Sequence, residues 1–191
     1  PSLGNVQTNY TYNLRNQLPQ VQMPRGGTTQ YRTFAYDLAT GRLTSAANPE
    51  NGTVSYTYNA DGTPASKTDA KGQHVEYSYD SYRRVTQIRR YNSSGVEQTC
   101  QRANFTYDQG TNGWGRLTST TWGGSSCTGG SWSQSYQYNT PGRVTRKTQS
   151  GGGAYLQANY TYDTEGKLVS TQYPSSGPTF TYTFDALGRP I

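Results

Sequence analysis

The chain has 191 residues, a formal net charge of +6 and a hydrophobic fraction of only 30%. No apolar run is long enough to cross a bilayer as a helix, and Leu, Glu and Lys are scarce beside Thr and Tyr, which argues against a helical bundle, a coiled coil or an α/β enzyme. Aromatic residues make up 13% of the chain and include 18 Tyr, so rings can supply the buried surface. We expect an ordered, polar, all-β protein.

A four-residue signature recurs along the chain: an aromatic residue, any residue, a second aromatic residue, and Asp or Asn. The eight copies place their second aromatic residues 21 to 31 positions apart. Two rings separated by one residue point to the same face of a strand, so each copy predicts a strand with one aromatic face. The signature residues are Tyr10 and Tyr12; Phe34, Tyr36 and Asp37; Tyr56 and Tyr58; Tyr77, Tyr79 and Asp80; Phe105, Tyr107 and Asp108; Tyr136 and Tyr138; Tyr160, Tyr162 and Asp163; and Tyr182, Phe184 and Asp185.

A turn follows most signatures, because Asp or Asn bonds the backbone two residues ahead and a Gly then supplies a positive φ. After that Gly come Arg or Lys, then Leu or Val, which start a return strand. Each repeat is thus a β-hairpin, and a second tight turn joins it to the next, giving an antiparallel meander of about sixteen strands. Open sheets of this size curl or close, so we expect a curved wall. The turn residues are Gly41 and Arg42, Gly115 and Arg116, Gly142 and Arg143, Gly166 and Lys167, and Gly188 and Arg189.

These motifs resemble the YD-repeat, or Rhs-repeat, family. Its hallmark is Tyr-Asp followed by Gly-Arg-Leu at this spacing, as in Tyr36-Asp37 with Gly41-Arg42-Leu43. The resemblance covers essentially the whole chain and implies β-hairpins that spiral into a hollow shell. In bacterial Rhs proteins and in the B and C components of insecticidal toxin complexes such a shell encloses a toxic polypeptide, and in teneurins it belongs to an adhesion protein. Nothing after Tyr182 resembles the self-cleaving aspartyl segment of the bacterial members.

Residues 1–191 are predicted to form a single array of about eight repeats and to be a fragment of a longer chain. An irregular insert around 96–135 holds all three Trp and both Cys. Trp114, Trp122 and Trp132 have two interpretations: an exposed aromatic platform for a ligand such as a sugar, or apolar anchors for long loops.

The insert also predicts a disulfide between Cys100 and Cys127. With Tyr107 opposite Arg116, strand pairing places residue 123 across from Cys100, and the Gly- and Ser-rich segment that follows can fold back. Two cysteines that bracket one hairpin of a secreted chain favour a bond.

The sequence has few residues that suit catalysis, so we expect no catalytic residues, no cofactor and no metal. The single His, His74, lies beside a turn, where it is interpreted as a solvated side chain, and the four Glu lie near loops of different repeats. The signature aspartates could line up as calcium ligands, but Asn replaces Asp three times, which favours turn capping. Arg83, Arg84, Arg89 and Arg90 alternate between the two faces of a strand and build no nucleic-acid patch.

The sequence therefore predicts a non-catalytic structural module of a large secreted or cell-surface bacterial protein, forming part of a β-shell or an extracellular fibre. Its expected partners are the neighbouring repeats of a longer parent chain or head-to-tail copies of itself, with no nucleic acid and no membrane span. The alternative is a carbohydrate-binding or adhesion module that uses the exposed Trp and Tyr of repeats five and six to bind a polysaccharide.

Overall fold

A computed structural model describes residues 7–25, 27–174 and 176–191. The described chain is all-β, with fifteen strands and a single turn of 3-10 helix. Strand pairing is antiparallel, and the order of the strands in the sheet is their order along the chain, so the predicted meander of hairpins is confirmed. None of the described residues forms a helix long and apolar enough to span a bilayer.

The strands are short, and tight turns join most of them. The described residues do not form the sixteenth expected strand, which would be the return strand of the last repeat. In its place Phe184 and Pro190 form an isolated bridge. The elements are β1 (Asn9–Thr11), β2 (Gln20–Arg25), β3 (Thr28–Tyr36), β4 (Leu43–Asn48), β5 (Gly52–Tyr58), β6 (Pro64–Thr68), β7 (His74–Tyr79), β8 (Val85–Tyr91), η1 (Thr99–Gln101), β9 (Ala103–Tyr107), β10 (Leu117–Gly123), β11 (Ser131–Tyr138), β12 (Val144–Gly151), β13 (Ala154–Tyr162), β14 (Leu168–Gln172) and β15 (Thr179–Thr181).

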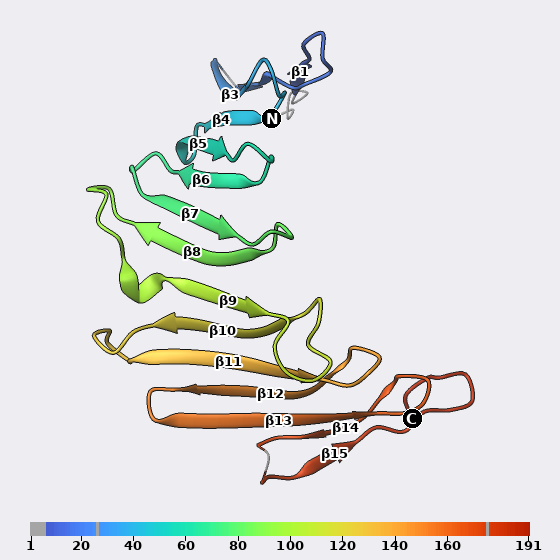
Figure 1. Ribbon diagram of the computed structural model, residues 1–191. Coiled ribbons are helices and arrows are strands. Elements are labelled where there is room, and N and C mark those ends of the chain that lie inside the picture. Colours follow the sequence, from blue (N-terminus) through green and yellow to red (C-terminus); the bar gives the residue numbers. More distant parts are fainter. Residues whose placement is uncertain (1–6, 26, 175) are drawn as a thin grey trace. The chain divides into compact units, whose positions relative to one another are not determined.

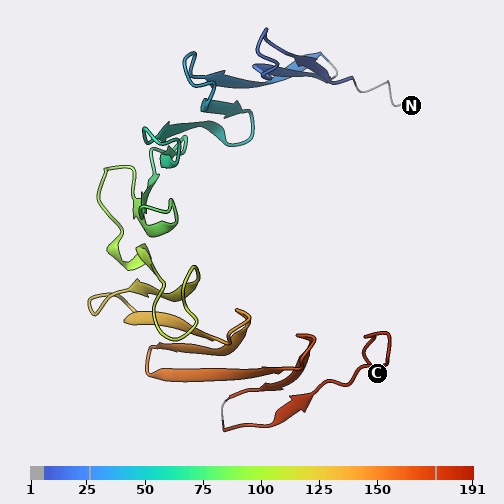
Figure 2. The ribbon, with the colours of Figure 1, turned by 45° about the vertical axis from the view of Figure 1, so that its right-hand side comes forward.

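The chain divides into two compact units. The first comprises Pro1–Ser78 with Arg89–Gln98, and the second comprises Tyr79–Ile88 with Thr99–Ile191. Within each unit the strands form one layer, and each strand lies beside the next one along the chain (Figures 1 and 2).

The two faces of the sheet differ in chemistry, because residues directly opposite each other on paired strands share a face. On one face Phe34 pairs with Ala46, which pairs with Val54, and both aliphatic residues are buried. The opposite face carries hydroxyl pairs, such as Thr57 with Ser66, whose side-chain oxygens are 2.7 Å apart.

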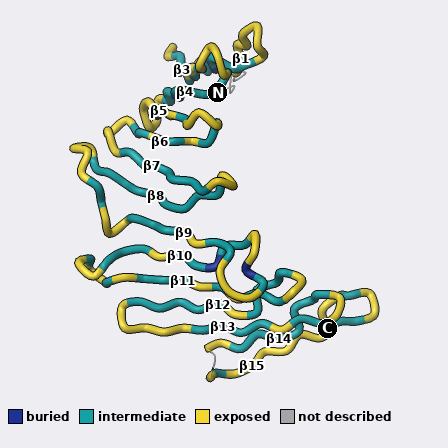
Figure 3. The backbone as a smooth tube through the Cα atoms, viewed as in Figure 1, coloured by how far each residue is buried: buried dark blue, intermediate teal, exposed yellow. Residues whose placement is uncertain are grey.

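Burial on the aromatic face is partial. None of the described side chains is completely buried, and the backbone tube is coloured almost entirely as intermediate or exposed (Figure 3). The signature rings from Phe34 to Tyr162 and that of Phe184 are half-buried, whereas Tyr10 (59%), Tyr12 (58%) and Tyr182 (43%) are exposed. One layer of strands can cover its rings only with neighbouring side chains of the same face.

A β-bulge recurs where the second signature ring meets the return strand. Tyr36 pairs with Leu43 but the preceding residue pairs with Ser45, so Thr44 is an extra residue. Among the strand pairs whose register the structure describes, five hairpins show such a shift, and the sequence pattern did not predict these shifts. A bulge bends the strand and increases its local twist.

The bulge also corrects the register predicted for the insert. Tyr107 pairs with Leu117 rather than with Arg116, and Thr118 is the extra residue. The Thr118 side chain is buried and its Oγ1 donates a hydrogen bond to the Thr106 carbonyl (3.0 Å).

Candidate functional site: the repeat junction

The signature Asp or Asn closes the turn that follows each signature strand. The amide of Asp163 donates to the Lys167 carbonyl (3.0 Å), and its Oδ1 accepts the Lys167 amide (2.8 Å). Asn139 makes the same two contacts with Arg143, at 3.0 and 2.8 Å. Because the turn needs only one side-chain oxygen as acceptor, Asn can replace Asp and keep the same hydrogen bond. Among the described residues, no three His, Cys, Asp or Glu lie close enough together to hold a metal ion.

The second signature ring ties its repeat to the preceding one. The hydroxyl of Tyr58 donates to the Leu43 carbonyl (2.9 Å), which belongs to the first residue of the previous return strand. Because this acceptor is a backbone group, the bond does not depend on which apolar side chain occupies the position. The same bond joins Tyr36 to Leu18 (3.1 Å), Tyr107 to Val85 (2.9 Å), Tyr138 to Leu117 (2.6 Å) and Tyr162 to Val144 (2.9 Å).

A cation from the preceding repeat lies over the same ring. Continuing the register of β4 and β5 places Arg42 opposite Tyr58, and its Cζ is 5.7 Å from the ring centroid. This distance suits a cation–π contact. The equivalent pairs are Arg84 with Tyr107 (4.4 Å), Arg116 with Tyr138 (5.7 Å), Arg143 with Tyr162 (5.8 Å) and Lys167 with Phe184 (5.7 Å).

The turn Gly of the following repeat leaves room for that cation. A Cβ at Gly142 would overlap the guanidinium of Arg116, and a Cβ at Gly166 would overlap that of Arg143. The sequence explains these glycines by backbone conformation alone, but in the structure they also provide the surface on which the Arg packs. We call the cation, the ring, the carbonyl that its hydroxyl contacts, and this Gly the repeat junction.

Comparisons with known proteins agree with this repeat. The sequence model of the RHS repeat family matches residues 36–74 and 58–94. Residues 36–94 therefore carry RHS repeats. A search of curated proteins gives no match for the chain.

A solved structure shares the fold of the chain. A structure of the Tc holotoxin pore of Photorhabdus luminescens (mutation TccC3-D651A) superimposes with a TM-score of 0.71 at 18% identity, covering 96% of this chain and 10% of that one. A crystal structure of TcdB2-TccC3-TEV gives 0.48 at 15% identity, covering 96% and 13%. The chain therefore spans about a tenth of the solved chains that it matches, and at this identity the likeness is one of fold.

One repeat junction carries additional charge. Arg84 Nε contacts Asp80 Oδ2 (2.7 Å), and its Nη1 contacts Asp108 Oδ1 (3.0 Å). The hydrogen bonds that Arg84 donates to Asp108 and then to Asp80 raise the pKa of Arg84, and the bond from Arg84 lowers the pKa of Asp108. Arg84 also lies between two rings, 5.1 Å from the centroid of Tyr82 and 4.4 Å from that of Tyr107.

The structure separates the three Trp, for which the sequence left open a ligand platform or anchors for long loops. Trp122 and Trp132 are cross-strand partners with nearly parallel rings, 6.5 Å apart, and Trp132 covers Gly151. This pair is half-buried and anchors the hairpin. Trp114 is 74% exposed in the loop after Asp108, where it lines a pocket of about 260 Å³ with Tyr82, Arg84, Asp108 and Gly115.

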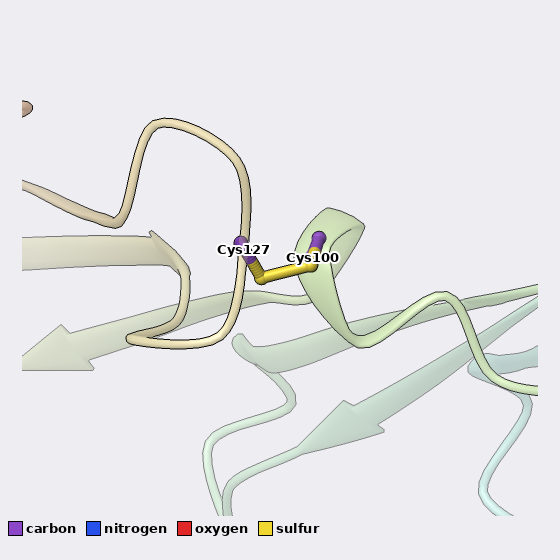
Figure 4. Close-up of a disulfide and its surroundings, with 2 residues drawn as sticks. All are labelled: Cys100 and Cys127. Atoms are coloured by element: carbon purple, nitrogen blue, oxygen red, sulfur yellow. A yellow bond between two sulfur atoms is a disulfide. The ribbon is translucent and has the colours of Figure 1, made fainter.

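Cys100 and Cys127 form a disulfide that joins η1 to the turn after β10 (Figure 4). Their Cα atoms are 5.5 Å apart, and the bond spans 27 residues of sequence. It holds the segment before β9 beside the segment after β10, and so joins the two ends of the β9–β10 hairpin.

His74 was interpreted as a solvated turn residue, and the structure corrects this. Its ring stacks on Tyr91 at 4.3 Å, and the Tyr91 hydroxyl donates to Glu76 Oε2 (2.9 Å), which Arg89 Nη2 also contacts (3.0 Å). Burial, followed by the bond to Glu76, raises the pKa of Tyr91. His74 Nε2 lies 3.9 Å from Glu76 Oε1. These side chains form a cluster across strands β7 and β8, and the cluster does not resemble a catalytic triad.

Proposed function

We propose that the chain is a non-catalytic structural segment of a longer bacterial protein, secreted or exposed at the cell surface, in which residues 1–191 form one array of about eight repeats within a wall or shell. The repeat junction carries this proposal. Its Tyr hydroxyls donate to backbone carbonyls, its cations cover rings, and its Asp or Asn side chains close turns. The chemistry that recurs most often in the sequence is thus used to join one repeat to the next.

Two further observations support the proposal. The fold resembles a tenth of a Tc holotoxin pore chain, which suits a segment of a larger wall. The Cys100–Cys127 bond suits an oxidising compartment, where disulfides form and persist.

An antibody raised against the chain tests this proposal in the source cells. We expect it to detect a polypeptide much larger than 21.1 kDa in the medium or on the cell surface. Detection of a cytoplasmic polypeptide of that small mass would contradict the proposal.

A second candidate is a saccharide-binding module, which the pocket beside Trp114 favours. Trp114 and Tyr82, 74% and 68% exposed, line it together with the Arg84–Asp108 pair. Exposed rings stack on the apolar faces of sugars, while nearby charged groups bond to sugar hydroxyls.

A glycan array with wild type and Trp114→Ala tests this candidate. Tyr155→Ala is the control, because Tyr155 is also exposed (65%) but does not line this pocket. We expect binding to be lost only with Trp114→Ala. Absence of binding by the wild type, or equal loss in both variants, would contradict a saccharide site.

A further inference from the structure

The turn that follows Asp108 is longer than the turn of the next repeat, and it carries Trp114. In the next repeat Asn139 Oδ1 accepts the amide of Arg143, four residues ahead (2.8 Å). Asp108 Oδ1 instead accepts the amide of Gly115, seven residues ahead (2.6 Å). The additional residues place an indole ring beside a charged junction.

Two exposed rings line the pocket at this junction. Trp114 comes from the longer turn, and Tyr82 comes from the turn that follows β7. The Trp114 carbonyl accepts a hydrogen bond from Arg116 Nη1 (2.9 Å), and the Tyr82 amide donates to Asp80 Oδ1 (2.9 Å). Hydrogen bonds therefore hold the backbone that carries each ring, so the two rings form a fixed platform.

The cation in this pocket is already bonded to carboxylates. Arg84 Nε contacts Asp80 Oδ2 (2.7 Å), while its Nη1 and Nη2 contact Asp108 Oδ1 (3.0 Å) and Oδ2 (2.5 Å). The neighbouring cations Arg83 and Arg116 do not line the pocket. An acidic ligand would approach a guanidinium that two carboxylates already neutralise, so its attraction to the pocket is small.

The ion pair still offers both a donor and an acceptor. Beyond these bonds Nη1 and Nη2 of Arg84 each keep an N–H group, and Asp108 Oδ2 keeps a lone pair. The two side chains are 23% and 19% exposed, so a ligand can reach them. A sugar hydroxyl both donates and accepts, whereas a carboxylate or a sulfate only accepts. The pocket therefore suits hydroxyl groups beside an apolar ring face.

We infer that the pocket beside Trp114 takes uncharged saccharides, and that Asp108 determines this specificity by occupying the guanidinium of Arg84. The inference rests on the saccharide candidate and deepens it. Asn in place of Asp108 removes the negative charge, keeps an oxygen for the Gly115 amide and tolerates the φ of 65°. Nη1 and Nη2 of Arg84 then face a neutral amide, and they can bind the carboxylate of an acidic sugar as a pair of donors.

A glycan array that carries both neutral glycans and glycans with uronic or sialic acid tests this. The proteins are wild type, Asp108→Asn and the control Asp163→Asn. Asp163 closes its own turn through the Lys167 amide (2.8 Å) but does not line this pocket. Circular dichroism checks that both variants fold, and titration at two salt concentrations measures the affinity for each glycan that binds.

We expect wild type and Asp163→Asn to bind neutral glycans, with less than about a twofold change in affinity between about 50 mM and about 500 mM NaCl. Asp108→Asn should bind acidic glycans about fivefold more tightly than wild type does, and high salt should remove this gain.

A preference of the wild type for acidic glycans, or the absence of a gain in Asp108→Asn, would overturn the inference and leave the saccharide candidate standing. Absence of all glycan binding by the wild type would overturn both. None of these results bears on the parent mass and cellular location that test the structural proposal.

Discussion

The junction between Arg116 and Gly142 offers a direct test of why Gly follows the signature. Replacing Gly142 by Ala forces an L-residue to φ of 89° and places a Cβ where the Arg116 guanidinium lies. The backbone strain costs about 1–2 kcal/mol of the free energy of unfolding. The displaced Arg116 also loses its cation–π contact with Tyr138, about 0.5–1 kcal/mol.

Displacement of Arg116 removes two further contacts, because its Nη1 donates to the carbonyls of Asn112 (3.2 Å) and Trp114 (2.9 Å). Weakening them adds about 1 kcal/mol. We therefore expect Gly142→Ala to destabilise the protein by about 3 kcal/mol. Gly153→Ala is the matched control, because Gly153 has φ of 80° with open space around it and should cost only the strain.

The assay is urea unfolding in a double-mutant cycle with Arg116→Ala. Once Arg116 is truncated, Gly142→Ala should cost about 1–2 kcal/mol, as in the control, so the coupling between the two positions should be about 1.5 kcal/mol. An equal cost of Gly142→Ala in both backgrounds would refute the packing role of Gly142 and leave only its backbone role.

Further measurements test the ring, the disulfide and the charge cluster. Tyr138→Ala should cost about 3 kcal/mol or more in urea unfolding and Tyr138→Phe about 1 kcal/mol, against less than about 1 kcal/mol for the exposed Tyr155→Ala; equal, small effects would contradict the ring ladder. Thiol labelling of denatured, unreduced protein should find no reactive Cys, and reduction should lower stability by about 3–4 kcal/mol, whereas two reactive thiols per chain would rule out the bond. The pKa values of Asp80 and Asp108 are lowered in the folded protein, so they contribute stability that is fully present above the unfolded pKa of about 4 and is lost as pH falls below it. The melting temperature of the wild type should therefore fall in acid, and that of Arg84→Ala should fall much less. An equal fall in the wild type and in Arg84→Ala would exclude the cluster as the cause.

The sequence by itself determined the hairpins. Alternation of rings with small polar residues specifies a strand with one aromatic face, and Asp163 with Gly166 specifies the turn that follows it. Both signals are local, since they depend on side-chain periodicity and on backbone bonds within four residues. The order of strands follows from the same signals, because short turns leave each strand beside the next.

The tertiary structure decided which side chains meet across repeats. Arg42 precedes its ring, Tyr58, by 16 residues, and Arg116 precedes Tyr138 by 22, because the connecting hairpins differ in length. No fixed spacing in the sequence marks these pairs, and the bulges shift the register further.

The same holds for residues outside the signature. Trp122 and Trp132 meet only because their strands pair in one register, while Trp114, eight residues before Trp122, is carried away by its loop. His74 and Tyr91 stack for the same reason, from adjacent strands. Local chemistry therefore specified each hairpin, and the register between strands, a non-local property, built the junctions.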